Sequence, residues 1–169
     1  MKILNVVLIT VLMTLLAGCA NLADGSDQPF TGSGGKALNM ILVNHNHRPI
    51  SQAFVSTNWA ANAGAGDVKG PGGGGIVCCY NVTDWRKPVK VMWTFSAVRE
   101  QSIDHPDGSY TPGKVLIPKE DHVAMVSLPP RMPISSDDRF KRERNLCVIF
   151  RDLNTVELQY TAGFDCEDK

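Results

Sequence analysis

Short apolar segments with a period of two residues constrain this chain more than any other feature of its sequence. In the clearest of them, "VKVMWTF" (89–95), valine and aromatic residues alternate with Lys90, Met92 and Thr94. Such alternation, rich in β-branched and aromatic residues, is typical of a half-buried strand. Similar segments separated by turn residues occupy 38–44, 52–60, 76–82, 114–118, 122–129, 146–150 and 155–161. About eight strands within residues 38–169 predict a single all-β domain, an antiparallel β-sandwich or a flattened barrel.

Evidence for helix is confined to one charged segment, "SSDDRFKRER" (135–144). Ser136 or Asp137 is a suitable N-cap, and opposite charges recur four residues apart. Phe140 is its single apolar residue, so we expect a minor helix near 136–144 on the surface of the domain.

The N-terminus indicates export and lipidation. Lys2 precedes an apolar run that ends in Leu16-Ala17-Gly18-Cys19, which resembles the lipobox of bacterial lipoproteins. The run is shorter than the roughly 20 apolar residues that span a bilayer and fits the core of a signal peptide. By this resemblance, residues 1–18 are cleaved, Cys19 is acylated, and 19–37 form a flexible polar tether. An ordinary signal peptide with an incidental cysteine is the alternative.

The same N-terminal segment indicates the membrane to which the protein is exported and affects the net charge of the mature chain. In such precursors an aspartate after the lipidated cysteine retains the protein in the inner membrane, and here the residue is Ala20. The resemblance therefore implies an outer-membrane lipoprotein that faces the periplasm. Removal of 1–18 from the 169 residues leaves 151 residues, and loss of Lys2 changes the net charge from zero to −1. This charge gives no electrostatic attraction to nucleic acid.

Four cysteines remain in the mature chain: Cys78, Cys79, Cys147 and Cys166. In an oxidising compartment they predict two disulfides. Adjacent residues of a regular strand point to opposite faces, so we expect Cys78 and Cys79 to bond different partners. Either pairing with Cys147 and Cys166 is open. We favour one bond to Cys147 across the sheets and one to the C-terminal tail. No C-x-x-C motif supports the alternative of a metal or redox site.

Catalytic patterns are weak, and the sequence predicts a protein that is not an enzyme and needs no cofactor. No G-x-S-x-G elbow is present, and the glycine run 70–75 lacks the Lys-Ser/Thr of a phosphate-binding loop. His45 and His47 would share a face if their strand continued and could provide two zinc ligands. A metal-dependent hydrolase is therefore one hypothesis, and polar residues at a strand end are the simpler interpretation. Binding is expected instead on the long loops 61–75, 99–113 and 129–145.

The segment "GGGGIVCCYNVTDWRKPVKVMWTF" (72–95) resembles the central motif of a family of small bacterial lipoproteins of unassigned function. Its members share a glycine-rich stretch, paired cysteines, a Trp-Arg-x-x-(Leu/Val)-x-Val element and a tryptophan in the next strand. The segment "NHNHRPISQAFV" (44–55) is similar to the first strand pair of the family, and the resemblance covers roughly residues 38–128.

Genes of such lipoproteins often lie beside phospholipase effectors of the type VI secretion system. The resemblance therefore implies an immunity protein that binds and neutralises a secreted phospholipase. A structural or ligand-binding envelope lipoprotein without a toxin partner is the alternative. Tight inhibition needs aromatic or arginine anchors. The candidates are Trp59, Trp85, Arg86, Tyr110, Arg131 and Phe140, although Trp59 and Trp85 could equally be core residues.

Overall fold

The computed structural model describes residues 35–166. The expected signal peptide, Cys19 and nearly all of the expected tether lie outside these residues. The described part consists of strands and connections: β1 (Lys36–Asn44), β2 (Ile50–Val55), β3 (Asn58–Ala63), β4 (Gly72–Val82), β5 (Val89–Phe95), β6 (Val98–Arg99), β7 (Ile103–Asp104), β8 (Tyr110–Thr111), β9 (Val115–Ile117), β10 (Glu120–Val126), β11 (Asn145–Phe150) and β12 (Val156–Thr161).

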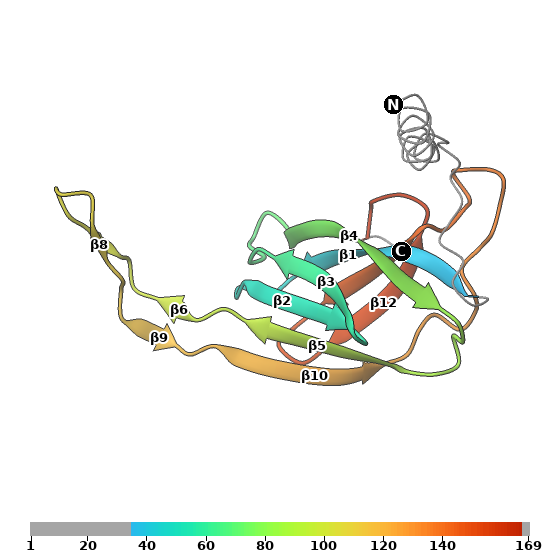
Figure 1. Cartoon of the computed structure of the whole chain (residues 1–169), viewed down its shortest axis with the longest axis horizontal. Helices are drawn as coiled ribbons and strands as arrows, with labels where there is room; N and C mark the ends of the chain where they lie inside the picture. Colours follow the sequence, from blue (N-terminus) through green and yellow to red (C-terminus); the bar gives the residue numbers. More distant parts are fainter. Residues whose placement is uncertain (1–34, 167–169) are drawn as a thin grey trace, which may run out of the picture.

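Eight strands form one curled sheet in the order β10-β5-β2-β3-β4-β1-β11-β12. Strands β3 and β4 share a single register pair, Ala63 with Gly74, so the sheet divides there into two four-stranded halves. The halves curl toward each other until β10 approaches β12, which gives a half-barrel (Figure 1). The predicted all-β sandwich or barrel is confirmed. The sheet departs from the predicted antiparallel arrangement at one place, where β1 pairs with β11 in parallel.

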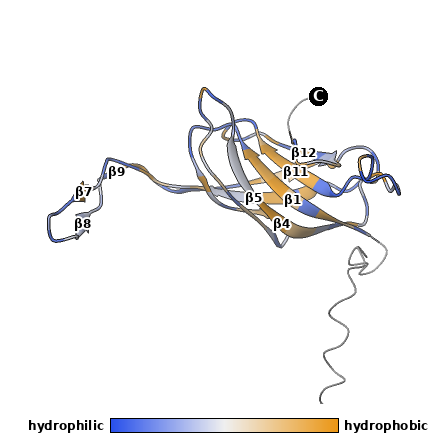
Figure 2. Ribbon diagram, turned by 90° about the horizontal axis from the view of Figure 1, so that it is seen from above, coloured by the Kyte–Doolittle hydropathy of each residue, from blue (hydrophilic) through white to orange (hydrophobic). Residues whose placement is uncertain are grey.

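The larger of two buried clusters fills the concave side of the sheet, and a smaller one that includes Cys147 and Cys166 lies on the other face of β1 and β11. Figure 2 shows the hydrophobic residues concentrated along β1 and β11, the strands in the middle of one half. The second half contributes Val91, Trp93 and Phe95 of β5, all of which are buried. Burial of each such side chain stabilises the fold by about 1.5–3 kcal/mol. The predicted alternation of β5 is therefore the pattern that attaches this strand to the core.

Two glycines of the "GGGG" run allow neighbouring backbones to approach closely. A Cβ atom on Gly74 would lie 2.5 Å from the carbonyl oxygen of Asn62, and one on Gly72 would overlap the backbone of Gly64. Residues 72–75 thus belong to β4 rather than to the expected loop 61–75. Glycine in a strand often marks a sharp bend or the close approach of another backbone, and here it permits close approach.

A β-bulge at Cys78–Cys79 changes the orientation of β4. Leu38 and Met40 of β1 are opposite Tyr80 and Val77, so the two residues Cys78 and Cys79 are opposite the single residue Asn39. The extra residue reverses the alternation. Val77 therefore packs against the core, while Ile76 and Cys78 are exposed. Strict alternation within 76–82 predicts that Ile76, Cys78, Tyr80 and Val82 share one face, and this prediction is wrong for Ile76 and Cys78.

Two further expectations are wrong. The segment 52–60 is a hairpin of β2 and β3 rather than one strand, and it turns at Ser56, which has a φ of 56°. The helix near 136–144 is absent from the described residues, and only a single turn forms around Asp138. The backbone N–H groups of Lys141 and Arg142 donate to its carbonyl oxygen, each at 3.0 Å. With Phe140 exposed, the segment has no apolar face against which a helix could pack.

The expected loop 99–113 is a narrow β-arm, which we define as residues 98–117. It continues the β5–β10 hairpin through the pairs β6–β9 and β7–β8. Figure 1 shows it projecting from the sheet at the end opposite to the start of β1. At its tip the amide of His105 donates to the carbonyl oxygen of Ser109, and Gly108 has a φ of +81°.

Candidate functional site

Four apolar side chains form a continuous row across the convex face of the sheet. Phe54 of β2 is opposite Trp59 of β3 and Met92 of β5, and Met92 is opposite Val123 of β10. Residues directly opposite one another in a sheet point to the same side, so their side chains are neighbours. Trp59 is 50% exposed and Val123 is 62% exposed. We call these four residues the outer apolar row.

A polar row borders the outer apolar row. The amide nitrogen of Gln52 donates to the hydroxyl oxygen of Thr94 at 3.2 Å, and that hydroxyl donates to the carboxylate of Asp121 at 2.6 Å. A shallow hollow of about 390 Å³ lies between the two rows; its lining includes Gln52, Phe54, Met92, Thr94, Asp121 and Val123. An apolar centre beside ordered polar side chains is the usual composition of a protein-binding surface.

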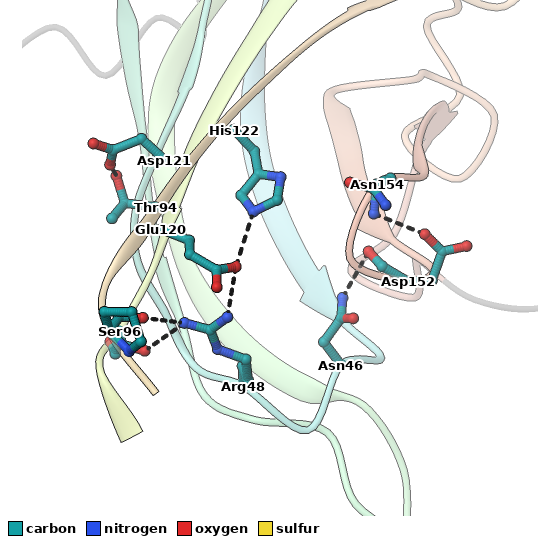
Figure 3. Close-up of polar contacts among 10 residues, drawn as sticks. Asn46, Arg48, Thr94, Ser96, Glu120, Asp121, His122, Asp152 and Asn154 are labelled. Atoms are coloured by element: carbon teal, nitrogen blue, oxygen red, sulfur yellow. Dashed lines mark hydrogen bonds and ion pairs between the residues drawn. The ribbon is translucent and has the colours of Figure 1, made fainter. Parts of the chain in front are cut away.

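A buried arginine on the core side of the sheet lies where β5 and β10 lead into the β-arm (Figure 3). The Arg48 side chain is 3% exposed, and one guanidinium nitrogen donates to Oε2 of Glu120 at 2.7 Å. The other donates to the carbonyl oxygens of Pro118 at 2.8 Å and Ser96 at 3.2 Å. Three acceptors from β10 and the flanking connections are thus bound by one side chain, which also lies over the Phe95 ring.

The electrostatics of this cluster favour charged Glu120. The hydrogen bond from Arg48 lowers the pKa of the Glu120 carboxyl, and His122 lowers it further from 3.5 Å. His122 also stacks on Trp93, with 5.2 Å between ring centroids and 15° between planes. Arg48, Glu120 and His122 thus lie together at the junction between the sheet and the arm. None of the three was predicted from the sequence as a functional residue.

The β-arm exposes apolar side chains along its length: Ile103, Tyr110, Val115 and Leu116. The sequence-predicted anchor Tyr110 is 66% exposed near the tip. Arm charges are of both signs, so the arm carries no strong field of its own. The arm is therefore a mostly polar hairpin with isolated, exposed apolar side chains.

The other predicted anchors lie in different parts of the structure. Trp59 lies in the outer apolar row, whereas Trp85 is half-buried against the core in the β4–β5 connection. Arg86 is exposed and stacks on Trp85, with 4.8 Å between the guanidinium carbon and the ring centroid. Phe140 is 76% exposed in the turn before β11. These connections and the arm lie at opposite ends of the sheet, so the predicted anchors do not form one site.

Arg131 is engaged within the protein. Its two terminal nitrogens donate to both oxygens of Glu143, at 2.6 and 2.7 Å, and the guanidinium lies over the Tyr160 ring. The hydrogen bonds lower the pKa of Glu143 and raise that of Arg131. Binding of a partner through Arg131 would require this bidentate pair to open, which makes it a poorer anchor than Trp59.

His45 and His47 lie in the connection after β1, because the strand ends at Asn44. Asn44 and Asn46 are buried and fix this connection: Asn44 donates to the carbonyl oxygens of Arg48 and Gly64, and Asn46 donates to that of Asp152. His45 Nε2 lies 3.1 Å from a guanidinium nitrogen of Arg151, and His47 is exposed. Within residues 35–166 no three His, Cys, Asp or Glu residues are placed to hold a metal ion.

The cysteines pair differently from expectation. Cys147 is bonded to Cys166, and Cys78 is bonded to its neighbour Cys79. The expected bond across the sheets is therefore wrong, because Cys147 in β11 lies beside the C-terminal segment, whereas the bulge brings the two sulfur atoms of β4 together. As predicted, one disulfide attaches the C-terminal tail through Cys166, but the cysteine bonded to Cys166 is Cys147.

The rows Trp59–Phe54–Met92–Val123 and Gln52–Thr94–Asp121 were not recognised from the sequence as a surface. The signal was present in part, because Met92 and Thr94 were placed on the side of β5 away from the core. Recognising the rows needs the order β3-β2-β5-β10 and its register, which alternation within one strand does not provide.

Comparison with known proteins gives no relative: no family model, curated protein or solved structure matches the chain. Among residues 35–166, no helix has the length and apolar character needed to cross a bilayer.

Proposed function

We propose that this chain is a periplasm-facing outer-membrane lipoprotein that binds and neutralises a secreted phospholipase of the type VI secretion system. The lipobox at Cys19 and the resemblance of residues 38–128 to immunity-type lipoproteins support the location and the partner. The outer apolar row is the structural observation that carries the proposal, because it exposes the large apolar side chains of Trp59 and Val123 on a sheet.

The row has the properties that a protein partner needs. Its side chains are fixed by cross-strand neighbours, so binding costs little conformational entropy. Large apolar side chains surrounded by ordered polar groups provide most of the binding energy at protein interfaces. A phospholipase in turn has an apolar surface around its acyl-chain cleft, which is a chemically suitable counterpart.

The test uses the purified lipoprotein and the phospholipase encoded beside its gene. We expect a stable complex and loss of phospholipid hydrolysis at equimolar protein. Trp59→Ala combined with Val123→Ser should weaken the complex at least tenfold, about 1.4 kcal/mol. Val68→Ala is the matched control, because Val68 is fully exposed in the loop between β3 and β4 and is not part of the row.

The immunity proposal fails if the two proteins do not associate, or if deletion of the gene leaves cells as resistant to the phospholipase as before. Either result would favour the structural or ligand-binding lipoprotein. If the double variant forms the complex normally, the phospholipase is still the partner, but the outer apolar row is excluded as the surface that binds it.

A further inference from the structure

The Cys78–Cys79 pair lies at an accessible position of the sheet. It forms the β-bulge of β4, in which Cys78 is exposed and Cys79 is half-buried. Strand β1 pairs with this stretch on one side, whereas the register of β3 with β4 is limited to Gly74, so within residues 35–166 no strand pairs with the opposite edge beside the two cysteines. A thiol can therefore approach the exposed Cys78 from the solvent.

This disulfide does not stabilise the fold in the way that the second one does. A disulfide stabilises a protein chiefly by closing a loop of the unfolded chain, and the gain grows with loop length. Cys78 and Cys79 are one residue apart and close almost no loop, whereas Cys147 and Cys166 are 19 residues apart. Cys147 and Cys166 are also buried, at 0% and 4% exposed.

We propose that Cys78–Cys79 is a thiol–disulfide exchange site whose substrate is a dithiol, such as the reduced active site of a dithiol oxidoreductase. Exposed disulfides with no structural role are the type that exchanges readily, and buried ones resist reduction. The assignment rests on exposure, the bulge and loop length, and it is independent of the proposed phospholipase partner.

A thiolate of the dithiol attacks the more exposed sulfur, that of Cys78; the bond between the two sulfurs breaks, and Cys79 leaves as a thiolate that takes a proton from water. The second thiolate of the dithiol then attacks the dithiol's sulfur in the mixed disulfide. Cys78 is released as a thiolate and is protonated in turn. Two electrons pass to the pair, and the dithiol becomes a disulfide.

The test is titration of the native protein with dithiothreitol, followed by alkylation of free thiols and peptide mass mapping. We expect Cys78 and Cys79 to be alkylated at dithiothreitol concentrations at least about tenfold lower than Cys147 and Cys166. Opening of both disulfides at the same concentration would overturn the proposal. A map that joins Cys78 or Cys79 to Cys147 or Cys166 would also overturn it.

Single variants test which sulfur is attacked. In Cys79→Ser the remaining Cys78 thiol should form a mixed disulfide with oxidised glutathione several-fold faster than Cys79 does in Cys78→Ser, because Cys78 is exposed and Cys79 is half-buried. Equal or reversed rates would overturn the assignment of Cys78. The double variant Cys78→Ser/Cys79→Ser should melt within about 3 °C of the native protein, because the pair closes no loop; a larger fall would identify the pair as a structural element and overturn the proposal.

Discussion

At the scale of single residues, buried polar side chains hold this domain in shape. Arg48 binds one carboxylate and two carbonyl oxygens that belong to β10 and the connections beside it. Asn44 and Asn46 similarly bind three carbonyl oxygens of neighbouring segments. The "NHNHRP" segment, which suggested a metal site, is therefore a structural joint in which the asparagines and the arginine do the binding.

Replacement of Arg48 by methionine keeps the side-chain length and removes the hydrogen bonds. The carbonyl oxygens of Ser96 and Pro118 would lose their partner, and an unsatisfied buried polar group costs about 1–3 kcal/mol. We expect Arg48→Met to lower the free energy of unfolding by about 3 kcal/mol in urea denaturation. Lys87→Met is the control, because its ion pair with Asp84 is long, at 3.9 Å, and exposed; an equal loss in both variants would contradict the role given to Arg48.

The Arg131–Glu143 pair predicts a dependence of stability on acid. Because hydrogen bonds from Arg131 lower the pKa of Glu143 in the folded protein, this contribution is present above the unfolded-state value of about 4.3. It is lost as the pH falls through the lower folded-state pKa. We expect urea unfolding midpoints to decrease below about pH 4, and less steeply in Glu143→Gln; identical slopes would show that other carboxyls dominate.

Tyr160 predicts the opposite sign at alkaline pH. Burial raises the pKa of its phenol to about 12, so the folded protein favours the neutral form. The resulting stabilisation is complete below the unfolded-state value of about 10 and is lost as the pH rises through 12. Tyr160→Phe should retain its midpoint better than the native protein between about pH 10 and 12. Ultraviolet titration of phenolate in the native protein provides the direct check.

At the scale of elements, alternation predicted the central strands and missed the joints between them. The β5 boundaries, 89–95, are those of the structure because a buried valine and three buried partners repeat without interruption. The β2–β3 turn was missed because Ser56 and Thr57 carry no glycine or proline signal. The bulge at Cys78–Cys79 was missed because an inserted residue looks like continued alternation in a sequence. The β-arm was read as a loop because its hairpin buries almost nothing.

The Cys147–Cys166 disulfide ties β11 to the end of the described chain. It closes a loop of 19 residues, for which loop entropy predicts about 3 kcal/mol. We expect Cys147→Ala/Cys166→Ala to lower the melting temperature by about 10 °C in calorimetry. This result should contrast with the small change expected for Cys78→Ser/Cys79→Ser, and equal effects of the two double variants would contradict the distinction.

The β-arm should be dispensable for folding. Its exposed side chains do not contribute to the core, and its hydrogen bonds are mostly between its own two strands. A variant in which 99–114 is replaced by a short Asn-Gly turn should therefore keep its melting temperature within about 3 °C. Limited proteolysis of the native chain should cut first within 99–114, and a first cut elsewhere would show that the arm is better protected than its exposure indicates.

At the scale of the whole molecule, the fold class follows from the sequence and the arrangement of the halves does not. Many short alternating segments predict an all-β domain whatever their order. The parallel pairing of β1 with β11 and the single contact register between β3 and β4 depend on which distant strands meet. Parallel neighbours arise here from strands about a hundred residues apart, and local patterns contain no information about that choice.

The proposed anchor makes a prediction for the whole protein. Cys19→Ser removes the thiol that would be acylated, and with it the acyl chains whose buried methylenes each contribute about 0.8 kcal/mol to membrane binding. We expect labelled fatty acid to be incorporated into the native protein and not into this variant, while the far-ultraviolet circular dichroism of the domain is unchanged. Incorporation of the label into the variant would contradict lipidation at Cys19.

The position of the β-arm relative to β1 has a consequence for encounters at the membrane. The chain enters the sheet at Lys36, and the arm leaves it at the far end (Figure 1). If Cys19 is held in the lipid, a domain extended on its tether places the Tyr110 hairpin farthest from the bilayer, outermost toward the periplasm. A protein diffusing toward the phospholipid would meet that hairpin before it met either lipid or sheet.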